Sequence, residues 1–367
     1  MTLGDTWTGL GLYEQALEEY LIALELNESL TGSESIEYLI VKGRLGGTFV
    51  RLGLHEEAVN SYTQQINGMQ MILDSVDPEL LQAKVDLAGI LLDMARYEES
   101  EAYLAEVIRI SQEDSSQATV ASVAAKISMG RLNGQRGDQV ASEQWFVQAL
   151  ADMDQFDEVD ESRRQDARYN LAISKARQGA SEDALLILRG LLDDRESLLG
   201  EDHPKTLATA GTIGGVLANS GDLPAAEPYL QRVYEGQLRT LGSEHRSTLV
   251  TMTNLGNMQF EQGKFELARA TAQMGLNVAL RSRGSDDQVT HMLQRLMARV
   301  HMAQGEFDEA QELAQKAVDG AVLIHGENSG QTRLSLDMLI QVLDARGDTE
   351  AAEAARERVE RISGKGS

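Results

Sequence analysis

The most regular feature of the chain is a turn residue that returns every 42 residues from one end to the other. The residue is glycine at eight of the nine positions and alanine at one. The turn positions are Gly11, Gly53, Ala95, Gly137, Gly179, Gly221, Gly263, Gly305 and Gly347. A constant period of this length predicts a linear array of like units, in which each unit contacts only its neighbours.

Apolar and small residues occupy fixed positions around each turn. Eight residues before it stands a large aliphatic residue: Leu3, Leu45, Leu87, Met129, Leu171, Ile213, Leu255, Met297 and Leu339. Seven before it stands a small one, with Ile340 as the exception: Gly4, Gly46, Ala88, Gly130, Ala172, Gly214, Gly256 and Ala298. Five after it stands another small one: Ala16, Ala58, Ser100, Ser142, Ala184, Ala226, Ala268, Ala310 and Ala352.

These positions predict two helices in each unit. In 248–262 the residues Leu249, Met252 and Leu255 recur at helical spacing, and the segment 12–26 that follows a turn has the same spacing. Two antiparallel helices approach closely only where side chains are small. We therefore expect the two small columns to face each other across each helix hairpin, with Tyr20, Tyr62 and Phe146 sharing a core column.

The columns resemble the tetratricopeptide repeat (TPR), and the period resembles its 42-residue subtype found in kinesin light chain. The linker pattern of that subtype is clearest at 199–207 (LGEDHPKTL) and 241–249 (LGSEHRSTL). The resemblance implies an all-α, right-handed α-solenoid, or superhelix, of about nine tandem helix-turn-helix units. A single array is expected over 1–362, followed by a flexible tail at 363–367.

The first unit is predicted to be incomplete. Leu3 and Gly4 already occupy core positions, so the first helix should start before Met1. Either the chain is a fragment of a longer protein or the array begins with a shortened helix. The fragment is the preferred interpretation, because Thr8-Gly9-Leu10 offers no polar outer face.

The composition and net charge argue against several classes of binding partner. The chain has 33 Lys and Arg against 58 Asp and Glu, a net charge of −25, which disfavours nucleic acid and anionic membranes. The hydrophobic fraction of 42% is too high for a disordered chain. No cysteine, signal peptide or long apolar run is present, so we expect no membrane insertion and a cytoplasmic location.

No motif of an enzyme, metal site or cofactor site is found, and we expect no cofactor. His203, His245 and His325 recur in the linkers, where a role in helix-start geometry is expected. The paired carboxylates Asp193-Asp194 and Asp286-Asp287 are assigned to linkers as helix N-terminal charges.

In this family the first helix of each pair lines the concave surface, which implies a groove formed by positions 13, 10, 9, 6, 3 and 2 before the turn. The candidate peptide-binding residues are Arg44, Arg51, Arg131, Asn170, Arg177, Asn254, Asn257, Arg295 and Arg299. The six columns hold six basic and seven acidic residues, so the groove is nearly neutral. The arginines could bind carboxylates of a peptide, or could form salt bridges between neighbouring helices.

Two functions remain open. The first is a non-enzymatic protein-protein interaction scaffold that binds a peptide or a partner helix in the groove. The second is the regulatory or sensor tail of a larger signalling enzyme, a protein kinase or NTPase, with its catalytic domain upstream of Met1. The sequence leaves the oligomeric state open.

Overall fold

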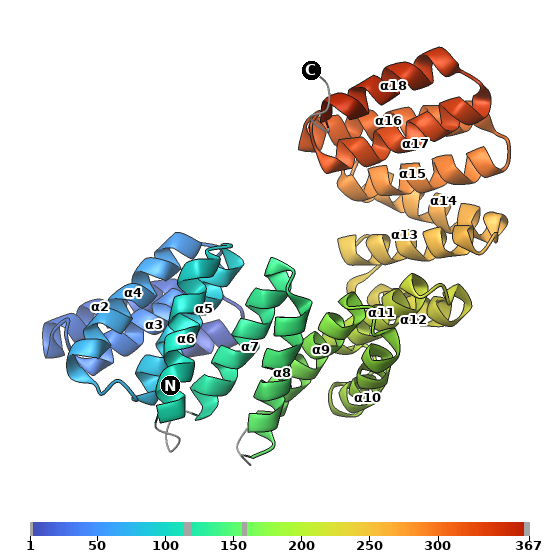
Figure 1. The fold of residues 1–367 in the computed structure, drawn as a ribbon. Coiled ribbons are helices and arrows are strands. Elements are labelled where there is room, and N and C mark those ends of the chain that lie inside the picture. The colour runs from blue at the N-terminus through green and yellow to red at the C-terminus, as the bar shows by residue number, and fades with distance from the viewer. Residues whose placement is uncertain (1–2, 114–118, 156–159, 363–367) are drawn as a thin grey trace. The chain divides into compact units, whose positions relative to one another are not determined.

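The computed structural model describes residues 3–113, 119–155 and 160–362, and these residues form 18 helices and no strand (Figure 1). The all-α class and the pairing of helices around each predicted turn are confirmed. The predicted tail, 363–367, lies outside the described residues.

The helices before the turns carry odd numbers and those after the turns carry even numbers. The odd helices are α1 Leu3–Gly9, α3 Ile36–Arg51, α5 Pro78–Asp93, α7 Thr119–Arg136, α9 Glu161–Arg177, α11 Pro204–Asn219, α13 Arg246–Glu261, α15 Gln288–Ala303 and α17 Gly330–Arg346. The even helices are α2 Tyr13–Thr31, α4 His55–Ile72, α6 Tyr97–Glu113, α8 Gln139–Met153, α10 Ser181–Leu199, α12 Leu223–Leu241, α14 Phe265–Ser282, α16 Phe307–His325 and α18 Thr349–Ile362.

The chain divides into two compact units, Met1–Ala184 and Leu185–Ser367, and the division falls within α10. In unit 1, successive helices from α1 to α9 pack against each other, and α7 also packs against α5 and α9. In unit 2, successive helices from α11 to α18 pack in the same way, and α15 also packs against α13 and α17. The odd helices α5, α7 and α9 of unit 1 and α13, α15 and α17 of unit 2 therefore lie side by side. We call the side of the odd helices away from the even ones the odd-helix face of each unit.

All nine predicted turn residues adopt a positive φ, the left-handed conformation that ends a helix. Eight of them are glycines, which adopt it without steric cost. Ala95, at φ 58°, is the only non-glycine residue with positive φ in the described part of the chain. The turn positions read from the sequence are confirmed.

The two small columns let the helices of a pair touch. Ser100 Oγ donates a 2.7 Å hydrogen bond to the main-chain oxygen of Ala88, so these columns do face each other. At Gly4, Gly46 and Gly130 of the first column, an aromatic side chain from the second helix covers the glycine. A Cβ atom built on Gly46 would lie 2.6 Å from Tyr62, and one on Gly130 would lie 2.7 Å from Phe146. Glycine here makes room for an aromatic ring.

The large aliphatic column is buried in every helix pair except the first, α1–α2. Leu45 is 4% exposed and packs with Ala16 and Tyr20 of the preceding pair. Leu3, expected in the core, is 55% exposed, and that prediction is wrong. The reason is that this column packs on the preceding helix pair, and no described pair precedes α1. The short α1, seven residues long, agrees with the predicted incomplete first unit.

Candidate functional site

The main hollows of the structure lie on the odd-helix faces. Three are in unit 1: an α1–α5 hollow of about 430 Å³, an α3–α9 hollow of about 590 Å³ and an α7–α9 hollow of about 190 Å³. The first two share Arg51, Tyr62 and Asp86 in their linings, and the last two share Arg131. They thus form a continuous series. In unit 2, an α13–α17 hollow of about 460 Å³ is lined only by α13, α15 and α17.

Eight of the nine candidate residues line these hollows. Arg44, Arg51, Arg131, Asn170 and Arg177 line those of unit 1, whereas Asn257, Arg295 and Arg299 line the α13–α17 hollow. Asn254 is exposed on α13 but is not among the lining residues. Each unit therefore has its own set of candidate residues, and their role in binding remains a prediction.

Three candidate arginines, Arg44, Arg131 and Arg299, form ion pairs between adjacent odd helices. Arg44 pairs with Asp5 of α1, and that hydrogen bond raises the pKa of Arg44. Arg131 Nη2 lies 3.1 Å from Asp93 Oδ1 of α5. These surface pairs contribute about 0–1 kcal/mol each. The salt-bridge alternative from the sequence thus applies to these side chains.

Arg299 is held even more firmly. It pairs with Glu261, donates to Asn257 Oδ1 at 2.8 Å, and lies 4.3 Å from the ring centre of Phe260. Asn257 in turn donates to the main-chain oxygen of Thr253 at 3.0 Å. Both candidates are therefore already engaged within the protein.

Three other candidate arginines have no carboxylate partner within the described residues: Arg51, Arg177 and Arg295. Arg295 is half-buried between α13 and α17, and its closest polar contact is Ser335 Oγ at 3.4 Å. Burial lowers the pKa of its guanidinium. A partly desolvated cation without a counter-ion favours an anionic ligand group.

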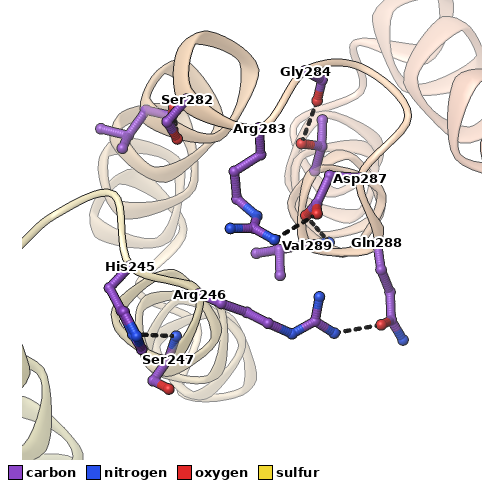
Figure 2. Close-up of polar contacts among 11 residues, drawn as sticks. His245, Arg246, Ser247, Ser282, Arg283, Gly284, Asp287, Gln288 and Val289 are labelled. Carbon is purple, nitrogen blue, oxygen red and sulfur yellow. Dashed lines mark hydrogen bonds and ion pairs between the residues drawn. The ribbon is translucent and has the colours of Figure 1, made fainter. Parts of the chain in front are cut away.

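The linker histidines were predicted to shape helix starts, and two do so. His203 and His245 are the N-caps of α11 and α13. The Nδ1 atom of each accepts a 3.2 Å hydrogen bond from the main-chain N–H of the residue two positions later in the chain. Figure 2 shows His245 beside Ser247. His325 instead ends α16, and Ser329 caps α17, so the prediction for His325 is wrong. It lies four residues before the register of the other two.

Of the paired carboxylates, Asp287 caps α15, as expected. It accepts from the Val289 amide at 2.8 Å and pairs with Arg283 Nη2 at 2.8 Å (Figure 2). Arg246 of α13 reaches Gln288 at the start of α15 in the same view. Asp193 and Asp194 lie inside α10, so their assignment to a linker is wrong. The helix α10, which is 19 residues long, continues through both aspartates.

Among the described residues there is no cluster of three or more His, Cys, Asp or Glu side chains able to hold a metal ion. The helices that the structure describes include none long and apolar enough to cross a membrane.

Sequence reasoning missed Gln65 and Tyr62 of α4 as lining residues of the α1–α5 hollow. Both belong to an even helix, which the groove assignment left out. The sequence did contain a signal for Gln65, because the equivalent position is apolar in the other repeats. Those residues are Ala23, Val107, Ala149, Leu191, Val233, Gly275, Ala317 and Val359.

Known protein structures share this fold. The apo form of RapI matches with a TM-score of 0.68 and 14% identity, covering 99% of this chain and 96% of that chain. A signal transduction ATPase from Pyrococcus horikoshii with a tetratricopeptide repeat sensor matches with a TM-score of 0.61 and 11% identity, covering 95% of this chain and 51% of that one. The TPR-like repeats of a Podosopora anserina kinesin light chain match at 22% identity and a TM-score of 0.49, covering 57% of this chain and 98% of that chain.

Sequence comparison gives the family. No curated protein matches the chain. The model of the MalT-like TPR region matches residues 196–366, and a tetratricopeptide repeat model matches 80–113 and 165–205. Together they cover well over half of the chain and agree with the 42-residue register of its helix pairs. The chain belongs to the tetratricopeptide repeat family.

Proposed function

We propose that this protein is a non-enzymatic interaction scaffold, built as one array over 1–362, which binds an extended peptide or partner helix on its odd-helix face. The observation that carries the proposal is the series of hollows along the odd helices, with Arg51, Arg177 and Arg295 in their linings and without carboxylate partners among the described residues. A series of hollows along neighbouring helices suits a chain-like ligand better than a compact one.

The expected ligand carries acidic side chains. The α13–α17 hollow is lined by two arginines, Arg295 and Arg299, against one carboxylate, Asp337, in a chain that is otherwise strongly acidic. Arginine binds carboxylates through paired, charge-assisted hydrogen bonds. Asn170 and Asn254 are proposed as additional polar contacts. The net charge of −25 argues against nucleic acid, and the absence of cysteine supports a cytoplasmic location.

The test uses the full 367-residue chain and a phage-displayed library of random 12-residue peptides. Peptides selected by the wild-type protein are expected to contain Asp or Glu. Their affinity should fall about ten-fold in Arg295→Gln or in Arg51→Gln with Arg177→Gln, because a hydrogen bond to a charged group contributes about 1.5–3 kcal/mol.

The matched control is Arg109→Gln, which removes one exposed arginine from α6 that pairs with Glu113 of its own helix. Its affinity for the same peptides should equal that of the wild type. A library that yields no binder, or binders that ignore all three hollow arginines, would contradict the proposal.

A second candidate is a regulatory or sensor array of a larger signalling enzyme whose catalytic domain precedes Met1. The Pyrococcus horikoshii ATPase favours it, since an array of this fold forms about half of that chain. The coding sequence upstream of Met1 decides this point. An in-frame kinase or NTPase domain supports the sensor array, and a stop codon supports the independent scaffold.

A further inference from the structure

The α1–α5 hollow contains a buried amide that has no hydrogen-bond partner. Gln65 of α4 is only 6% exposed, and its Oε1 atom is buried without a partner in the structure. The side chain lines the hollow, so its remaining accessible surface faces that space. A buried amide left without hydrogen bonds costs about 1–3 kcal/mol of stability.

Packing does not require this amide. The equivalent residue in the next repeat is Val107, which is fully buried, and in a later repeat it is Val233, which is 5% exposed. An apolar side chain at this register therefore completes the same helix contact without an unsatisfied polar group. Gln65 departs from the repeat pattern in the direction that costs stability.

The Gln65 amide packs directly on the backbone of α3. A Cβ atom on Gly43 of α3 would lie 2.5 Å from both terminal atoms of the Gln65 amide, so any larger residue would displace it. The glycine column thus leaves the amide against bare backbone at the edge of the hollow. Glycine inside a helix costs about 0.5–1 kcal/mol relative to alanine, which is a second local cost at the same place.

A second polar group lies beside the first. Tyr62 occupies the register of Tyr20, whose hydroxyl donates to Asp5 at 2.7 Å. The residue equivalent to Asp5 in the second repeat is Gly47, and a Cβ there would lie 3.4 Å from the Tyr62 hydroxyl. The Tyr62 hydroxyl therefore lacks the acceptor that its counterpart uses, and it has no other partner among the described residues.

The Tyr62 hydroxyl stays protonated in this site. Burial raises its pKa, and the negative charge of Asp86 raises it further. Asp86 lies in the same hollow. Desolvation by the surrounding protein raises the pKa of its carboxyl, although the residue is exposed to solvent. The hollow thus offers an amide with both a donor and an acceptor, next to a neutral hydroxyl donor.

We propose that the Gln65 amide and the Tyr62 hydroxyl form a subsite for the main chain of a bound peptide, which enters beside Gly47, where an added Cβ would meet only the Tyr62 hydroxyl within 4 Å. The amide pairs with a peptide N–H or C=O, and the hydroxyl donates to a neighbouring peptide carbonyl. Gly47 allows the peptide backbone to approach α3 closely. This inference rests on the proposed function and assigns the ligand group that the hollow accepts.

The test is Gln65→Val in the full chain, which installs the residue found at this register in three other repeats. The melting temperature should stay the same or rise, because an unsatisfied amide is removed. The affinity for library peptides selected on the wild-type protein should fall about three- to ten-fold. Tyr62→Phe, which copies Phe146 at its register, should weaken binding with little change in melting temperature.

Backbone chemistry of the peptide makes the test specific. Each amide of a selected peptide is N-methylated in turn. One position should lose affinity for the wild-type protein and lose little further affinity for Gln65→Val, which identifies the main-chain group that pairs with the amide.

Two results would overturn the subsite while leaving the scaffold function intact. In the first, Gln65→Val binds the peptides as tightly as the wild type does. In the second, Gln65→Val melts several degrees lower than the wild type, which would show that Gln65 stabilises the fold. A library without binders would instead overturn the proposed function, and the subsite with it.

Discussion

The contact between Gly130 and Phe146 offers a direct test of how these helix pairs are packed. A Cβ atom on Gly130 would lie 2.7, 2.8 and 2.9 Å from three atoms of the Phe146 ring, which is 2% exposed. The ring cannot move aside without disturbing the core. Overpacking of this kind costs about 1–3 kcal/mol. Alanine recovers about 0.5–1 kcal/mol of helix propensity, so Gly130→Ala should destabilise the protein by about 1–2 kcal/mol.

Another repeat of the protein shows which residue in place of Phe146 would accommodate an alanine at position 130. One repeat earlier the same two positions hold Ala88 and Leu104, both fully buried in one core cluster. Phe146→Leu alone should cost about 1–2 kcal/mol through the space it leaves. The double variant Gly130→Ala with Phe146→Leu reproduces the Ala–Leu pair, so its loss should be at least 1 kcal/mol smaller than the sum of the two single losses.

Urea unfolding followed by circular dichroism measures these differences. Because repeat arrays need not unfold in two states, amide hydrogen exchange in α7 and α8 should accompany it. A Gly130→Ala variant as stable as wild type would refute the packing explanation. Losses of the single variants that add within about 0.5 kcal/mol would refute it as well.

Two further predictions concern single residues. Ala95→Gly should stabilise the protein by about 0.5–1 kcal/mol, because Ala95 has a φ of 58° that glycine adopts freely; thermal unfolding measures this, and a lower melting temperature would contradict it. The Lys175 ammonium, 2.7 Å from Glu143, lowers the pKa of that carboxyl below its usual value near 4.5. The folded state therefore binds fewer protons than the unfolded state there, and stability falls as pH drops from about 5 through the folded pKa. Glu143→Gln should show a shallower decline between pH 5 and 3.5, and equal slopes would count against the ion pair.

Much of the fold could be predicted because the repeat supplies nine copies of one pattern. The turn glycines and the small columns mark positions where only certain residue types satisfy the backbone, and the structure places them as expected. The errors occur where one residue departs from the average repeat. No described helix pair precedes Leu3 to cover it, and His325 is out of register with the true caps.

The candidate site could be predicted only in part. The register located residues on the odd helices, and eight of nine line hollows. It could not tell which arginines are engaged, because partners such as Asp93 for Arg131 lie 38 residues away on another helix. Gln65 was overlooked because its helix belongs to the other layer, and its amide reaches the hollow only because Gly43 has no side chain.

The sequence by itself determined the local geometry: where the turn of each helix pair lies, which side of a helix is apolar, and where the two helices of a pair touch. These follow from short-range sterics and the burial of apolar side chains, which repeat with the chain. Only the tertiary structure decided which charged groups neutralise each other and which polar groups are left without partners. Those outcomes depend on distances between side chains from different helices, and no period in the sequence encodes such distances.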